Sequence, residues 1–237
     1  CQRRTATVNT SDAPDERMNR EETRKKLVSA LLASALLLSA AAVTQTSAQA
    51  GEIAVIVKTV NSTFWQNVQK GADAALKEAG GANTLTFQGP ASESAIADQV
   101  NMVENAVNRG VAGIVLAPSD PDALVPAVKK AWEARIPVVI VDSQLAKGAE
   151  QYYQSFLATD NRKAGELAAK ALIDQVGTEG KLAVMSYVAG AGSEIGRVGG
   201  FTGYVMANSK RPIVGPFYST QQMAQAVNKT TDCIADV

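Results

Sequence analysis

Histidine is absent from the 237 residues of this sequence, and only two cysteines are present, Cys1 and Cys233. Without an imidazole the chain cannot form a Ser-His-Asp or Cys-His catalytic site, nor any metal site built on histidine. The Gly-x-Ser-x-Gly pattern of a hydrolase nucleophile does not occur either. We therefore expect a protein that is not an enzyme and that holds no metal and no cofactor.

A basic cluster is also missing beyond the amino-terminal region. Lys and Arg total 23, Asp and Glu total 23, and the formal net charge is zero. Binding to nucleic acid requires a face on which Lys and Arg gather, so we expect no nucleic-acid partner. Hydrophobic residues make up 46% of the chain, which is enough to bury one large core or two modest ones.

The first fifty residues have the pattern of an export signal. Met18 precedes a basic stretch, residues 27–43 form an apolar run, and the run leads to Ala48-Gln-Ala50, a small-x-small signal-peptidase pattern. A membrane-spanning helix is the alternative, but the run is short for one and polar residues follow it. We predict an upstream extension over residues 1–17 that is not native, and a signal peptide over residues 18–50 that is cleaved after Ala50. The mature protein would then be exported and not inserted in the membrane, and Cys233 would have no intramolecular partner.

From Gly51 onward, strand patterns alternate with helix patterns. Such regular βαβ units with short connections imply a parallel sheet that carries helices on both faces. Asp160 is placed to cap a helix that begins at about residue 161, and Pro121 to stand at the first position of an earlier helix. The expected strands are residues 53–57, 85–87, 111–117, 137–141, 152–158, 181–188 and 213–217. Further helices are expected over residues 64–79, 96–107 and 195–207 and from about residue 221.

Several short motifs follow one another in a fixed order: Phe64-Trp65, Ala117-Pro118-Ser119-Asp120, Val141-Asp142-Ser143, Ala158-Thr159-Asp160-Asn161, and Val188-Ala189-Gly190-Ala191-Gly192-Ser193 with Arg197 and Gly200-Phe201. Their order and spacing resemble the periplasmic monosaccharide-binding proteins of ABC importers, the ribose-binding type of type I periplasmic binding protein. The resemblance implies an α/β fold of two Rossmann-like lobes with parallel sheets, joined by crossing strands, with the sugar in the cleft between them. It places an N-terminal lobe over residues 51–158 and a partial C-terminal lobe over residues 159–237. Because the family's second lobe continues well beyond this point, we expect the chain to be truncated at its C-terminus.

The resemblance also implies which residues bind the sugar. Phe64 and Trp65 match the family's stacking pair, Asp142 matches a carboxylate at a strand's carboxyl end, and Arg197 matches an Arg that reaches across the cleft. Aromatic rings cover the apolar C–H faces of a sugar, and charged groups form strong hydrogen bonds to its hydroxyls. The same residues have simpler interpretations: a helix-face core for the aromatics, a turn or helix cap for Asp142, and a surface salt bridge for Arg197.

Three further positions complete the predicted site. Ser62 lies beside the aromatics, where the family often has Asn, and Gln221 falls near a further family contact. Ser143 stands where the ribose-binding proteins carry an Arg, so a bidentate donor is lost and ribose itself is put in doubt. The predicted ligand is a monosaccharide or polyol of unspecified identity, bound by Ser62, Phe64, Trp65, Asp142, Ser143, Arg197 and Gln221.

The expected mechanism is closure of the two lobes about the sugar, followed by delivery to an ABC transporter permease and its ATPase by a monomeric binding protein. Residues 190–196 imitate the glycine fingerprint of an NAD(P)-binding dehydrogenase, but the loop lies far into the chain and no Tyr-x-x-x-Lys pair follows it. A sugar-sensing regulator domain is a further alternative, but an export signal occupies the place of its DNA-binding segment.

Overall fold

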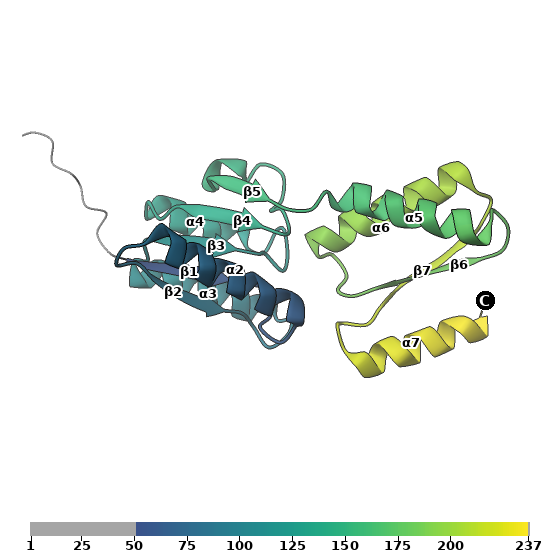
Figure 1. The fold of residues 1–237 in the computed structure, drawn as a ribbon, viewed down its shortest axis with the longest axis horizontal. Coiled ribbons are helices and arrows are strands. Elements are labelled where there is room, and N and C mark those ends of the chain that lie inside the picture. The colour runs from purple at the N-terminus through teal and green to yellow at the C-terminus, as the bar shows by residue number, and fades with distance from the viewer. Residues whose placement is uncertain (1–50, 237) are drawn as a thin grey trace, which may run out of the picture. The chain divides into compact units, whose positions relative to one another are not determined.

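The computed structural model describes residues 51–236 of the chain. The predicted upstream extension and signal peptide lie outside the described residues. The first sheet has five parallel strands in the order β2-β1-β3-β4-β5 (Figure 1). Its strands are β1 (Glu52–Ile56), β2 (Thr84–Gln88), β3 (Gly113–Leu116), β4 (Val138–Val141) and β5 (Ser155–Leu157).

Helices cover both faces of this sheet, as the alternating pattern predicted. Because neighbouring side chains along a strand point to opposite faces, Ala54 and Ile56 lie in one core and Val55 and Val57 in another. The first core is shared with α3 (Ile96–Arg109) and α4 (Val125–Glu133), and the second with α2 (Thr63–Ala79). The predicted α/β class with a parallel sheet is therefore confirmed.

A glutamine on α3 holds the carboxyl ends of two central strands. The Gln99 side chain is fully buried, and its amide nitrogen donates to the carbonyl oxygens of Val57 and Ala117 at 3.1 and 2.8 Å. Its amide oxygen accepts from the backbone N–H of Ser119 at 2.7 Å. One side chain thus satisfies three backbone groups where β1 and β3 end and their loops diverge.

The sequence signals for helix ends are confirmed at Gly110 and Asp160 and are wrong at Pro121. Gly110 ends α3 in the left-handed conformation (φ 68°), and the Asp160 carboxylate accepts from the N–H of Lys163 at 2.9 Å. Pro121 does not begin a helix as predicted, since α4 starts at Val125. The Asp120 carboxylate instead accepts from the two amides that follow Pro121, at residues 122 and 123, and closes a turn before the helix.

The second sheet has two parallel strands, β6 (Leu182–Ser186) and β7 (Ile213–Tyr218). It is accompanied by α5 (Asn161–Val176), α6 (Gly192–Asn208) and α7 (Met223–Asp236), while the 3₁₀ turn η2 (Glu150–Tyr152) precedes β5. The strand predicted over residues 152–158 spans only Ser155–Leu157, and the turn η2 takes Tyr152, the first of the predicted residues.

Helices α5 and α6 lie side by side with their backbones unusually close (Figure 1). A methyl group added at Gly165 of α5 would lie 2.1 Å from the carbonyl oxygen of Arg197 on α6. One added at Gly200 of α6 would lie 2.0 Å from the carbonyl oxygen of Arg162 on α5. Only glycine permits so close an approach, and it fixes the turn of α6 that carries Arg197.

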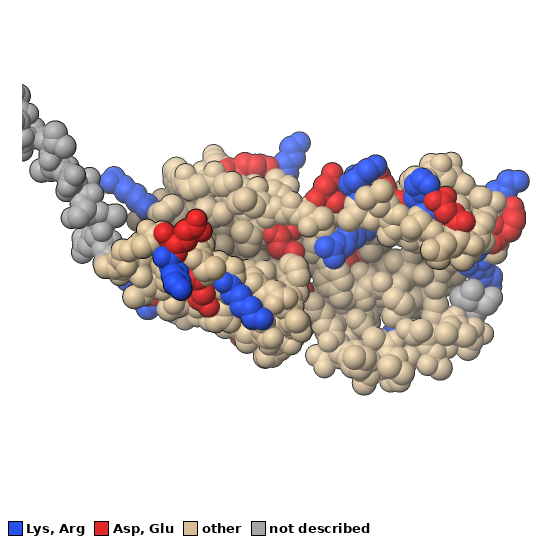
Figure 2. Space-filling model, viewed as in Figure 1, with Lys and Arg blue, Asp and Glu red and all other residues tan. Residues whose placement is uncertain are grey.

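Charged residues on the outer surface of α5 form pairs of opposite charge. Lys163 lies 3.2 Å from Glu166, and Lys170 lies 2.6 Å from Asp174. Figure 2 shows blue and red groups interspersed, with no extended patch of one sign on the face in view.

Candidate functional site

The loop after β1 brings two aromatic residues to the start of α2. Ser62 is the N-cap of that helix, and its hydroxyl accepts from the N–H of Trp65 at 3.4 Å. Phe64 is 57% exposed whereas Trp65 is 2% exposed, and their rings meet edge to face with centroids 4.8 Å apart. The adjacent aromatics thus differ: Trp65 belongs to the core beside Val55, and Phe64 presents its ring to solvent.

Trp65 is held in place through its indole nitrogen, which donates to the Glu93 carboxylate at 3.0 Å. Glu93 lies in the loop after β2 and is only 6% exposed. Its second carboxylate oxygen has no protein partner among residues 51–236. The Trp65–Glu93 pair therefore forms a polar surface on which the second carboxylate oxygen of Glu93 is available to accept a hydrogen bond.

A buried ion pair lies at the carboxyl ends of β1 and β4. Lys58, whose side chain is 2% exposed, places its ammonium 2.7 Å from Oδ2 of Asp142. Asp142 has φ 64°, a left-handed conformation that Asp adopts more readily than most residues. Oδ2 also accepts from the Ser143 hydroxyl at 3.0 Å, whereas Oδ1 has no protein partner among the described residues.

The elements of the second sheet contribute an arginine and a tyrosine. Arg197 on α6 donates from Nε to the Asn161 side chain at 2.8 Å, which leaves its two terminal amino groups without a protein partner in the described chain. The Tyr187 hydroxyl lies 2.5 Å from that of Ser193. Burial raises the pKa of Tyr187, so its phenol remains protonated and able to donate.

These side chains surround one cavity of about 420 Å³. Six of the seven predicted site residues line it, namely Ser62, Phe64, Trp65, Asp142, Arg197 and Gln221. The seventh, Ser143, is 2% exposed and lies beneath Asp142, so its role as a ligand contact stays a prediction. The remaining lining residues are Lys58, Glu93, Tyr187 and Ser193, none of which the sequence reasoning identified.

A sequence signal existed for only one of these missed residues. Lys58 is a lysine that directly follows an uninterrupted apolar strand, at the strand end where open α/β sheets bind ligands. Glu93 lies in a Ser- and Ala-rich loop, and Ser193 in a glycine loop, where neither residue type is unusual. Their place in the cavity depends on tertiary contacts alone.

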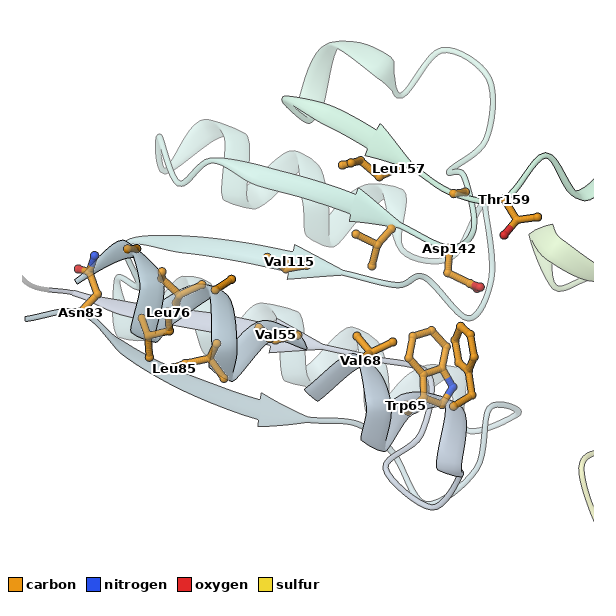
Figure 3. Close-up of a pocket in the computed structure, with 17 residues that line it drawn as sticks. Val55, Trp65, Val68, Leu76, Asn83, Leu85, Val115, Asp142, Leu157 and Thr159 are labelled. Carbon is orange, nitrogen blue, oxygen red and sulfur yellow. The ribbon is translucent and has the colours of Figure 1, made fainter. Parts of the chain in front are cut away.

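A second hollow, of about 600 Å³, lies along the sheet face next to α2 (Figure 3). Its lining is mostly aliphatic and includes Val55, Leu76 and Val115, with Trp65 and Asp142 at one end. A sugar needs a partner for each buried hydroxyl, and this groove supplies few. The smaller, polar cavity is therefore the better candidate for ligand binding.

Other kinds of site have no support in the described residues. The glycines of residues 190–196 have structural roles: Gly190 turns with φ 83°, Gly192 approaches Ser143, and Gly196 packs on Asn161. No group of three potential metal ligands occurs within residues 51–236, and Cys233 is buried and free. No helix in this part of the chain is long and apolar enough to cross a membrane.

Curated relatives of the chain are sugar-binding proteins. It is 29% identical over 188 residues to a D-ribose/D-allose-binding protein of Pseudomonas aeruginosa, covering 78% of this chain and 59% of that protein. It is 32% identical over 186 residues to the ribose import binding protein of Escherichia coli, with the same coverage of both chains. The chain thus spans between half and three fifths of the length of such relatives.

Solved structures show the same fold. An ABC transporter solute-binding protein of Agrobacterium vitis with bound D-fucose is 79% identical, with a TM-score of 0.77 over 78% of this chain and 64% of that one. A carbohydrate transporter solute-binding protein of Agrobacterium radiobacter in complex with D-arabinose is 31% identical, with a TM-score of 0.73 over 80% of this chain and 64% of that one. The profile of a family described as periplasmic binding protein domain matches residues 53–236. The chain therefore belongs to the periplasmic binding protein domain family.

Proposed function

We propose that the chain belongs to a periplasmic protein that captures a monosaccharide or polyol and delivers it to an ABC transporter. The observation that carries the proposal is that six residues predicted from the family resemblance line one polar cavity. The likeness to a D-fucose-bound protein at 79% identity makes D-fucose, or a sugar of closely similar shape, the first ligand to test.

The unpaired polar groups of the cavity suit a polyhydroxylated ligand. Oδ1 of Asp142 accepts a hydrogen bond from one sugar hydroxyl, and the terminal amino groups of Arg197 donate hydrogen bonds to other hydroxyls of the sugar. The exposed ring of Phe64 covers an apolar face of the sugar. Asp142 follows a strand of the first sheet, whereas Arg197 lies on α6, which accompanies the second sheet. A ligand that bridges them therefore favours a closed arrangement of the two α/β units.

The remaining parts of the proposal concern export and partners. The signal peptide over residues 18–50, cleaved after Ala50, takes the protein to the periplasm. There it acts as a monomer that presents its closed form to a membrane permease driven by an ATPase. Family membership and the transporter-associated structures support this role.

Titration calorimetry of the chain with D-fucose, D-arabinose, D-ribose and D-allose tests the proposal. Phe64→Ala should weaken binding of the preferred sugar about tenfold or more, since burial of a Phe side chain contributes about 1.5–3 kcal/mol. Trp132→Ala is the matched control, because Trp132 is 50% exposed, also meets one ring edge to face, and lies outside the cavity. Absence of heat with every sugar, or equal weakening by both variants, would overturn the assignment of this cavity.

A further inference from the structure

The Ser143 hydroxyl has no hydrogen-bonding capacity left for a ligand. It donates to Oδ2 of Asp142 at 3.0 Å, and it accepts from the Lys58 ammonium at 2.6 Å and from the backbone N–H of Ser193 at 3.2 Å. A serine hydroxyl offers one donor and two acceptor lone pairs, so all three are in use. Ser143 is also 2% exposed, which keeps it away from the cavity surface.

The three partners of Ser143 are themselves parts of the site. Lys58 has its three ammonium hydrogens directed to Asp142, Ser143 and, at 3.3 Å, the Ser193 hydroxyl. A buried ammonium is costly unless every hydrogen finds an acceptor, so this arrangement depends on both serines. With Oδ2 of Asp142 occupied by Lys58 and Ser143, the carboxylate is held with Oδ1 as its remaining acceptor.

Ser143 also connects the end of β4 to the first turn of α6. The N–H of Ser193 is one of the amides that a helix leaves without an internal partner at its start, and Ser143 supplies its acceptor. A methyl group added at Gly192 would lie 3.2 Å from Cβ of Ser143, so the two segments are already in tight contact.

We propose that Ser143 is a positioning residue and not a ligand contact. It fixes the Lys58 ammonium and the Asp142 carboxylate, and it anchors the α6 N-terminus that carries Ser193 toward the cavity. The ligand then meets an Asp142 that offers a single, preset acceptor oxygen. The consequence for sugar affinity rests on the proposed function, whereas the consequence for Lys58 and Ser193 does not.

The test compares the chain with Ser143→Ala and with Ser119→Ala as the control. Ser119 is equally buried, at 3% exposure, but its hydroxyl makes no hydrogen bond. Two readouts need no ligand: the rate at which an amine-acetylating reagent modifies Lys58, measured by mass spectrometry against the exposed Lys70, and hydrogen exchange of the Ser193 amide, measured by NMR. Ser143→Ala should raise the rate of Lys58 acetylation and the rate of Ser193 amide exchange severalfold, while amides in the interiors of α5 and α6 keep their protection. Ser119→Ala should change neither rate.

Calorimetry with D-fucose adds the binding readout, and Ser143→Ala should weaken binding about tenfold, a loss of about 1.4 kcal/mol. Unchanged Lys58 acetylation and Ser193 exchange in Ser143→Ala would overturn the positioning role, whatever the sugar affinity. Equal acceleration of exchange throughout the fold would also overturn it, because that result indicates general destabilisation. If the unaltered chain binds no sugar but both local readouts respond as expected, the proposed function fails and the positioning of Lys58 and Ser193 stands.

Discussion

The close packing of α5 against α6 predicts that alanine substitutions at two neighbouring glycines of α6 change the free energy of unfolding in opposite directions. In Gly200→Ala the new methyl carbon would lie 2.0 Å from the Arg162 carbonyl oxygen, and α5 and α6 would have to separate until the pair reaches the 3.4 Å of ordinary contact. Overpacking of this kind costs about 1–3 kcal/mol, and more when the obstacle is backbone. In Gly199→Ala nothing lies within 4 Å of the new methyl, so only the helix preference of Ala over Gly remains, about 1 kcal/mol of stabilisation.

Urea unfolding of the two variants measures the difference directly. Both gain the same helix preference, so the gap between their unfolding free energies reports the clash alone and should be at least about 2 kcal/mol. For a domain of this size that gap corresponds to roughly 4–8 °C in melting temperature. If Gly200→Ala were as stable as Gly199→Ala, the close approach of α5 and α6 described above would be refuted, and with it the account of how Arg197 is placed.

Three further predictions concern buried polar groups and pH. Gln99→Leu leaves three buried backbone groups without partners and should lower the unfolding free energy by at least about 3 kcal/mol in urea. Trp65→Phe removes the donor to the buried Glu93 and should cost about 1–3 kcal/mol in the same assay. The hydrogen bond from Arg109 lowers the pKa of Glu52, so the stability it contributes is present above the unfolded-state pKa and is lost as pH falls through the folded-state value. Arg109→Gln should therefore flatten the acid side of the profile of melting temperature against pH.

Each of these predictions has a result that contradicts it. A Gln99→Leu chain as stable as the original would mean that the loops after β1 and β3 find other partners. A Trp65→Phe chain with an unchanged free energy of unfolding would mean that water replaces the indole as hydrogen-bond donor to Glu93 without loss of stability. An acid limb that is identical with and without Arg109 would mean that other carboxylates dominate acid unfolding.

Much of the fold could be predicted because local patterns and tertiary structure agree. The apolar run at residues 53–57 is a strand buried on both faces, and Gly110 and Asp160 end and begin helices as their residue types indicate. The start of α4 was predicted wrongly, because Pro at a helix start and Asp in a turn compete over residues 120–124. Sequence alone does not say which of the two prevails.

The candidate site could be predicted only where its residues match the family pattern. Phe64, Asp142 and Arg197 were identified through their family pattern, and the structure brings them to one cavity. The buried partners escaped notice because their meaning lies in long-range contacts: Lys58 meets Ser193 across 135 positions of sequence. Ser143 was predicted as a ligand contact in place of a family arginine, since nothing local to it shows that its hydroxyl has three partners.

The hydrogen bonds of Gln99 affect which positions in the loops after β1 and β3 are free to change during evolution. Its amide bonds only to main-chain atoms, at residues 57, 117 and 119, and every amino acid supplies the same carbonyl groups and, except proline, the same N–H. The loops that follow β1 and β3 are therefore clamped by an interaction that ignores which side chains they carry. Exposed positions of these loops, such as Asn61, can then exchange residues while the backbone that presents them keeps its place.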